Sequence, residues 1–156
     1  MAKVFESTKM LDLGSCAFRQ PKALSHCRML HGYKLYAKFT FGCKELDKNH
    51  WVIDFGGLKG LKYKLEQQFD HTTCIAADDP QMELFKQMHL NGICDLRVMR
   101  NGTGIERIAE WCYDVGKEHI EGMTNYRCWV KQVEVWEHEK NSVIISKGIE
   151  PLSSKD

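Results

Sequence analysis

The chain has 156 residues, which is enough for one domain with its own hydrophobic core. Its formal net charge of +1 excludes a bulk attraction to nucleic acid or to an anionic membrane. Its sequence contains no apolar run of the roughly 20 residues that cross a bilayer. We therefore expect a single domain over residues 1–150 and a polar tail over 151–156, with neither nucleic acid nor membrane as a partner.

The cysteines and the N-terminal residues indicate the compartment. There are seven cysteines, an odd number, and no two of them form a Cys-x-x-Cys pair. This pattern favours reduced thiols over a disulfide framework or a zinc ribbon. The first six residues lack an apolar signal region, so we expect a cytoplasmic protein.

Hydrophobic periodicity predicts the secondary structure. Apolar residues alternate with polar ones over 33–43, the pattern of a half-buried strand, whereas Leu58, Leu61, Leu65 and Phe69 fall at helical spacing. In chain order the expected elements are a strand at 3–15, a loop at 16–30, the strand at 33–43, a short apolar extension at 51–55, a helix at 57–69, an irregular segment with an extra helix near 82–88 and an extra strand near 94–99, a helix at about 104–120, a strand at 127–137 and a last strand beginning at 143–145.

The order of the main elements is ββααββ. We expect an α+β fold in which a four-stranded antiparallel sheet carries two helices on one face. Such a sheet has open edges, and open edges commonly pair with another subunit, so we also expect a homo-oligomer.

Five short motifs follow these elements in a recognisable order. They are Cys27-x-x-x-His31-Gly32-Tyr33, Trp51-Val52-Ile53-Asp54-Phe55-x-x-Leu58-Lys59, Phe69-Asp70-His71, Gly104-Ile105-Glu106 and Val135-Trp136-Glu137. From about residue 5 to residue 147 the chain resembles the 6-pyruvoyltetrahydropterin synthase and 6-carboxytetrahydropterin synthase family. The resemblance implies the T-fold, or tunnelling fold, a pterin substrate (7,8-dihydroneopterin triphosphate), and a hexamer built as a pair of trimers with active sites between subunits.

Thiol, imidazole and carboxylate side chains are the candidates for proton transfer. The resemblance implies that Cys27 is the catalytic thiol, and its neighbours His26, Arg28 and His31 favour a thiolate. It also implies that Asp70 and His71, from a neighbouring subunit, relay protons with that thiol. Without the resemblance, Cys27 is a loop cysteine with no role and Asp-His a common surface dipeptide.

Two glutamates are candidates for substrate binding. The resemblance implies that Glu137 anchors the pterin, since a carboxylate accepts hydrogen bonds from the ring N–H and the amino group together. Glu134 and Glu139 are its nearby rivals. Glu106 matches a substrate-binding position of the family, although the preceding Pro-Thr of the family is absent. An acidic residue at a helix start also suits the helix dipole without any further function.

The metal site departs from the family pattern. Zinc in the family is held by three histidines, and only His31 stands at such a position here. Tyr33 replaces the second histidine of the pair, and Cys16, eleven residues before Cys27, takes the place of the first. One hypothesis is a rebuilt zinc site of Cys16 and His31 with Tyr33 or His26. The other is loss of zinc, with Tyr33 a strand aromatic and Cys16 a buried small residue.

From these features we predict a lyase most similar to 6-carboxytetrahydropterin synthase, on the route to queuosine and other 7-deazaguanines. The alternatives are 6-pyruvoyltetrahydropterin synthase-like activity, a non-catalytic protein that binds a pterin or purine-like ring and has lost its zinc, and an enzyme with an altered reaction. The substrate triphosphate needs cations, and candidates near the motifs are Arg19, Lys22, Arg28, Lys34 and Lys59. The 74–100 segment is longer than in typical members and is a candidate cover for the active site.

Overall fold

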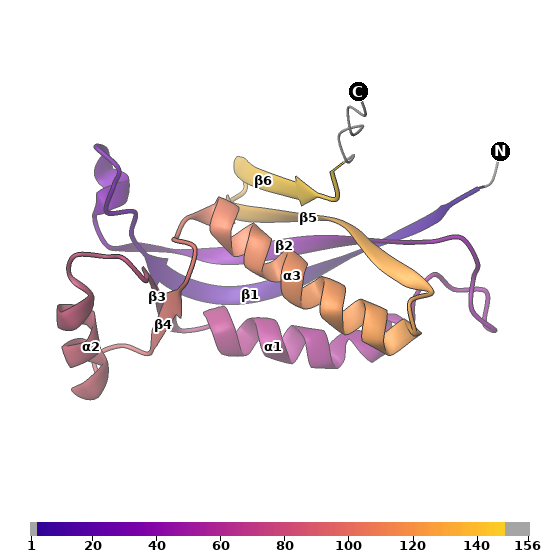
Figure 1. The fold of residues 1–156 in the computed structure, drawn as a ribbon, viewed down its shortest axis with the longest axis horizontal. Helices are drawn as coiled ribbons and strands as arrows, with labels where there is room; N and C mark the ends of the chain where they lie inside the picture. The colour runs from indigo at the N-terminus through magenta and orange to yellow at the C-terminus, as the bar shows by residue number, and fades with distance from the viewer. Residues whose placement is uncertain (1–2, 149–156) are drawn as a thin grey trace, which may run out of the picture.

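A computed structural model describes residues 3–148. A six-stranded mixed sheet in the order β4-β3-β1-β2-β5-β6 forms the centre of the molecule. Helices α1 and α3 lie across one face of its long strands, and α2 lies apart at one end (Figure 1). The elements are β1 (Phe5–Phe18), the 3₁₀ turn η1 (His26–Arg28), β2 (His31–Cys43), the 3₁₀ turn η2 (Phe55–Leu58), α1 (Lys59–Phe69), β3 (Thr72–Ala76), α2 (Met82–Leu90), β4 (Leu96–Met99), α3 (Ile105–Thr124), β5 (Cys128–His138) and β6 (Asn141–Ser146).

The strand register brings distant parts of the chain together. β1 and β2 pair antiparallel from Phe5 opposite Cys43 to Phe18 opposite His31, and β5 then pairs with β2 and with β6. On the other side of β1, strands β3 and β4 are added in parallel. The C-terminal end of β1 therefore lies between β3 and the N-terminal end of β2, at the end of the molecule where loop 19–30 projects (Figure 1).

The core lies between the sheet and its two long helices. Leu61, Leu65 and Phe69 of α1 are fully buried, as expected from their helical spacing. Alternate residues of the strands meet them from the sheet, where the side chain of Phe39 is also fully buried. In α3, Gly116 leaves room for that ring, because a Cβ there would lie 2.6 Å from Phe39 Cε1.

A bulge in β1 is built around Gly14. The pairing with β2 shifts between Asp12 and Gly14, and Gly14 has a φ of +85°, a conformation that favours glycine. A Cβ on Gly14 would lie only 2.0 Å from Asp70 Oδ1. The bulge therefore makes space for the side chain of Asp70 at the end of α1.

The expected α+β fold with the long helices and strands is confirmed, and the structure adds detail at the sheet edges. The sheet has six strands rather than four and is mixed rather than wholly antiparallel. The helix at 82–90 and the strand at 96–99 match expected extra elements, whereas β3 occupies a segment expected to be irregular. Residues 51–54 do not extend a strand; they lead into η2, where the Asp54 carboxylate caps the turn by accepting from the Gly56 N–H at 2.9 Å. The tail predicted at 151–156 lies outside the described residues.

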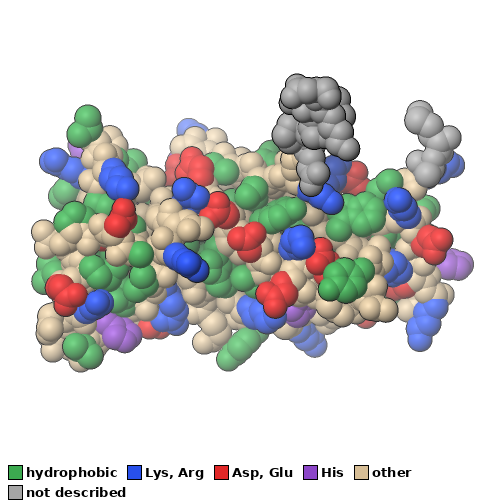
Figure 2. Space-filling view, in the orientation of Figure 1, with side chains coloured by type: hydrophobic (Ala, Val, Ile, Leu, Met, Phe, Trp, Pro, Cys, Tyr) green, Lys and Arg blue, Asp and Glu red, His purple; other side chains and the backbone are tan. Residues whose placement is uncertain are grey.

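The visible surface mixes acidic and basic side chains without one dominant sign (Figure 2). This agrees with the small net charge of the sequence. Among residues 3–148, none of the helices combines the length and the apolar character needed to cross a bilayer.

Candidate functional site

The thiol loop, residues 19–30, holds Cys27 at the surface. Cys27 is exposed in η1, whose first turn is capped by the Ser25 hydroxyl. The Gln20 N–H donates to the Cys27 carbonyl at 2.8 Å, and the Gln20 side-chain amide donates to the Thr103 carbonyl at 3.3 Å. The Thr103 hydroxyl in turn donates to the Arg19 carbonyl. These bonds tie the thiol loop to the residues that precede α3.

An aromatic cluster follows the thiol loop at the start of β2. The rings of Phe18, His31 and Tyr33 have centroids 5.0 to 6.0 Å apart, and the Tyr33 ring lies 6.1 Å from that of His138 on β5. His31 Nδ1 lies 2.6 Å from the Met29 carbonyl oxygen. Because a carbonyl only accepts, Nδ1 carries a hydrogen, and in the neutral imidazole the lone pair is then on Nε2. This tautomer is the one that a metal ligand or a proton acceptor at Nε2 requires.

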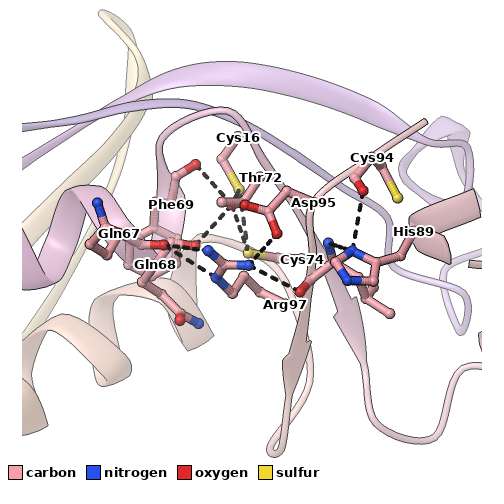
Figure 3. A network of polar contacts seen from close by, with 11 residues as sticks. Cys16, Gln67, Gln68, Phe69, Thr72, Cys74, His89, Cys94, Asp95 and Arg97 are labelled. Carbon is pink, nitrogen blue, oxygen red and sulfur yellow. Dashed lines mark hydrogen bonds and ion pairs between the residues drawn. The ribbon is translucent and has the colours of Figure 1, made fainter. Parts of the chain in front are cut away.

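Cys16 is directed into the core. Its Sγ lies 3.4 Å from Cys74 Sγ and 3.9 Å from the Thr72 hydroxyl, and its exposed fraction is 2% (Figure 3). The hydrogen bond between the two thiols lowers the pKa of Cys16. The same contact, followed by burial, raises the pKa of Cys74. Cys16 is therefore the member of this pair that ionises more readily.

Asp70 and His71 form a hydrogen-bonded pair in the turn between α1 and β3. His71 Nδ1 donates to Asp70 Oδ1 at 2.8 Å, and the Ser15 N–H donates to the same oxygen at 3.2 Å. The His71 backbone N–H donates to the Ser15 carbonyl at 2.7 Å, with His71 at a φ of +59°. The side chain of His71 is 85% exposed. The carboxylate fixes the tautomer, and the imidazole is presented to whatever lies outside this chain.

Three of the residues predicted for the site line one surface cavity. Cys16, Tyr33 and His71 border a cavity of about 470 Å³ beside the ends of β1 and β2. A neighbouring cavity of about 340 Å³ is lined by Asp70 and again by His71. Neither lining includes Cys27, Glu106 or Glu137. Within the described part of one chain, the thiol and the Asp-His pair are thus held on separate elements.

The candidate glutamates lie at two further places. Glu137 is 22% exposed near the end of β5, where the Asn141 side chain donates to it at 3.1 Å. Its rival Glu134 is already engaged by the Ser142 hydroxyl at 2.8 Å. Glu106 is exposed in the first turn of α3, next to the point where Thr103 ties down the thiol loop.

The three predicted metal ligands are not arranged as a zinc site in one chain. The strands place Cys16 opposite Tyr33 and His31 opposite Phe18. However, the Cys16 thiol contacts Cys74 and Thr72, and residues 3–148 contain no group of three His, Cys, Asp or Glu side chains that could hold a metal ion. These residues do not fit a three-ligand zinc site as they stand, and ligation by Cys16, His31 and Tyr33 stays a prediction.

Two arginines near α3 were missed by the sequence analysis. Arg100 and Arg107 line a cavity of about 510 Å³ together with Lys22, one of the cations considered for the triphosphate. Arg19, another of those cations, is instead bound to Asp79 by two hydrogen bonds of 2.8 and 2.7 Å. The sequence signal for them was the glycine-rich run Asn101–Gly104, which lies between the two arginines. Only the fold shows that both arginines face one cavity.

The comparisons with known proteins agree on one protein family. The family model of 6-pyruvoyl tetrahydropterin synthase matches residues 9–148. A 6-carboxy-5,6,7,8-tetrahydropterin synthase of Rickettsia typhi is 34% identical over 84 residues, which are 53% of this chain and 59% of that protein. The enzyme of that name from Aquifex aeolicus is 26% identical over 105 residues, 67% of this chain and 65% of that protein. The aligned part thus spans about three fifths of these curated relatives.

Solved structures share the fold. An uncharacterized protein from Wolinella succinogenes superposes with a TM-score of 0.80 at 19% identity, covering 94% of this chain and 99% of that one. The 6-pyruvoyl tetrahydropterin synthase of Plasmodium vivax superposes with a TM-score of 0.68 at 17% identity and the same coverage. Since the family model spans nearly all of the described residues, the chain belongs to the 6-pyruvoyl tetrahydropterin synthase family, a family of pterin lyases.

Proposed function

We propose that the protein is a lyase of the 6-carboxytetrahydropterin synthase type that acts on 7,8-dihydroneopterin triphosphate, on the route to queuosine and other 7-deazaguanines. The observation that supports this best is the Asp70–His71 pair. A carboxylate orients an exposed imidazole through a 2.8 Å hydrogen bond, and the left-handed backbone of His71 is held by its own bond to Ser15. Such an oriented imidazole is suited to proton transfer with a substrate.

Each residue of the proposed site has a chemical task. Cys27, as a thiolate, takes a proton from the side chain of the pterin, and His71, oriented by Asp70, passes protons to and from the reacting groups. Glu137 accepts the ring N–H and the amino group of the pterin through its two carboxylate oxygens. Glu106 contributes a further acceptor at the start of α3. In this branch of the family one water is consumed and triphosphate and acetaldehyde leave, whereas the other branch eliminates triphosphate alone.

The proposal places the complete site between subunits. In one chain Cys27 lies on the thiol loop and the exposed imidazole of His71 in the α1–β3 turn, with no hydrogen bond joining them among residues 3–148. A neighbouring copy can supply the missing partner, and the sheet edges formed by β4 and β6 offer backbone groups for pairing. We propose a hexamer built as a pair of trimers, in the cytoplasm, where its seven free cysteines stay reduced. Sedimentation analysis measures the subunit number directly.

The test is a product assay with 7,8-dihydroneopterin triphosphate and identification of the products by mass. We expect 6-carboxytetrahydropterin, with kcat lowered about 10²–10⁴-fold by Cys27→Ala or His71→Asn, the range for loss of a positioned acid or base. His50→Asn is the matched control, since His50 is also exposed and has a φ of +65° but lies outside the site. Formation of the pyruvoyl product would move the protein to the other branch. A folded oligomer that binds a pterin without turnover would replace the proposal by a binding function.

A further inference from the structure

The arginine cavity, the space of about 510 Å³ bordered by Arg100 and Arg107, lies at one end of the molecule. The thiol loop, the ends of β3 and β4 and the beginning of α3 come together at this end (Figure 1). The cavity is separate from the one that contains Cys16 and His71, and its volume lies in the usual range of small-molecule sites. Its lining is Gln20, Pro21, Lys22, Ala76–Asp78, Arg100–Thr103 and Arg107.

The lining is cationic. It contains three cations, Lys22, Arg100 and Arg107, against the single carboxylate of Asp78. Asp78 is bound by Lys22 at 2.9 Å, and this hydrogen bond holds the pKa of Asp78 below its usual range. Arg107 also contacts Glu110 at 3.0 Å, whereas Arg100 is exposed and forms no ion pair with residues 3–148. At least one guanidinium is therefore available to an anion.

The backbone between the two arginines has an unusual conformation. Gly102 and Gly104 have φ values of +112° and +111°. Residues other than glycine rarely adopt this backbone conformation. The first turn of α3 has no side-chain cap, and α3 is 20 residues long. That turn also contains the carboxylate of Glu106, so the positive potential at this end comes from the three cations of the lining.

The cavity is also connected to the loop that carries the proposed thiol. Gln20 lines the cavity, and its backbone N–H donates to the Cys27 carbonyl at 2.8 Å. Thr103 also lines the cavity, and its hydroxyl donates to the Arg19 carbonyl. A group bound by Arg100 and Arg107 therefore sits next to the loop that presents Cys27.

We infer that the arginine cavity binds the triphosphate of the substrate, with Arg100 as the main contact and Arg107 and Lys22 in support. The inference rests on the proposed function for the identity of the ligand. Guanidinium groups match phosphate oxygens in a two-point geometry, and a polyphosphate is the part of this substrate that carries charge. The pterin end then extends past Cys27 toward its own carboxylate anchor.

The first test measures binding of inorganic tripolyphosphate by calorimetry, which needs no turnover. We expect Arg100→Gln to raise the Kd at least tenfold and Arg100→Gln with Arg107→Gln to raise it further. Lys44→Gln removes one exposed cation just beyond β2, at the other end of the sheet, and is expected to change the Kd less than twofold. Equal affinity in the wild type and the double variant would overturn the inference.

The second test separates this inference from the proposed function. In the product assay, Arg100→Gln should raise KM for the triphosphate at least tenfold and leave inhibition by unphosphorylated 7,8-dihydroneopterin unchanged. Turnover with an unaltered KM would refute the triphosphate site but keep the lyase. Arginine-dependent binding of tripolyphosphate without any turnover would keep the polyanion site and refute the lyase.

Discussion

Gly14→Ala is expected to damage the Asp70–His71 pair from a distance of more than fifty residues in sequence. The new Cβ would lie 2.0 Å from Asp70 Oδ1 and 2.4 Å from its Cγ, so the carboxylate must move. Moving it breaks the contacts that Asp70 makes with the Ser15 N–H and with His71 Nδ1. The substitution therefore acts on the imidazole without touching it.

The expected loss of stability has two parts. Alanine in the left-handed region costs about 1 kcal/mol. Loss of the 3.2 Å contact between Ser15 and Asp70, which is exposed to water, adds about 1 kcal/mol. The total of about 2 kcal/mol corresponds to a fall in Tm of about 4–8 °C for a chain of this size. If the proposed lyase is correct, misplacement of the pair also lowers kcat/KM, by about 100-fold.

Gly92→Ala is the matched control for this prediction. Gly92 has a φ of +74°, but a Cβ there meets nothing within 4 Å. It therefore has the backbone cost of about 1 kcal/mol without the collision. Thermal denaturation and the product assay on both variants measure the difference. Equal changes in Tm and unaltered kcat/KM in both would refute the reasoning that Gly14 makes room for Asp70.

Two further predictions concern stability. Asp79→Asn should cost about 3 kcal/mol, because the fully buried Asp79 side chain is bound to Arg19 by a pair of hydrogen bonds. Arg19 also holds the pKa of Asp79 below its usual range. The wild type should therefore lose stability as the pH falls below about 4 and through the folded-state pKa of Asp79. Urea denaturation at several pH values should show this loss in the wild type and not in the variant. Gly116→Ala should lower the stability by about 1–3 kcal/mol because its Cβ would collide with Phe39, whereas Gly122→Ala, in the same helix with open space around it, should raise Tm. A stabilised Gly116→Ala would show that the ring moves aside freely.

The elements with clear periodicity could be predicted from the sequence. The two long helices each bury one face, and the strand at 33–43 alternates between more and less buried residues in its first half, so the buried positions repeat at a fixed interval. β3 could not be found in this way, because all five residues from Thr72 to Ala76 are buried and no alternation results. The four-stranded antiparallel sheet that we expected lacks β3 for this reason, whereas β4 matches the extra strand expected near 94–99.

Some parts of the candidate site could be predicted from the sequence, and others could not. The motif around Asp70 and His71 led to a hydrogen-bonded pair, because its partners are neighbours in sequence. The surroundings of Cys16 could not be foreseen, since Cys74 reaches it only through the parallel pairing of β1 with β3. The same limit applies to Arg100, whose position at a cavity with Lys22 depends on how loops far apart in sequence meet.

The pairing of β2 with β5 has a consequence for how the protein is made. Tyr36 lies opposite Trp136, so about one hundred residues separate the two partners, whereas β1 and β2 are joined by the thiol loop alone. Pairings of high sequence separation form late, because loop closure must be overcome first. Until β5 has been synthesised, the nascent chain exposes an unpaired edge of β2 together with buried-type side chains such as Phe39 and Phe41. An unpaired strand edge and exposed apolar side chains favour aggregation, so the first half of the chain carries this risk while β5 is still being synthesised.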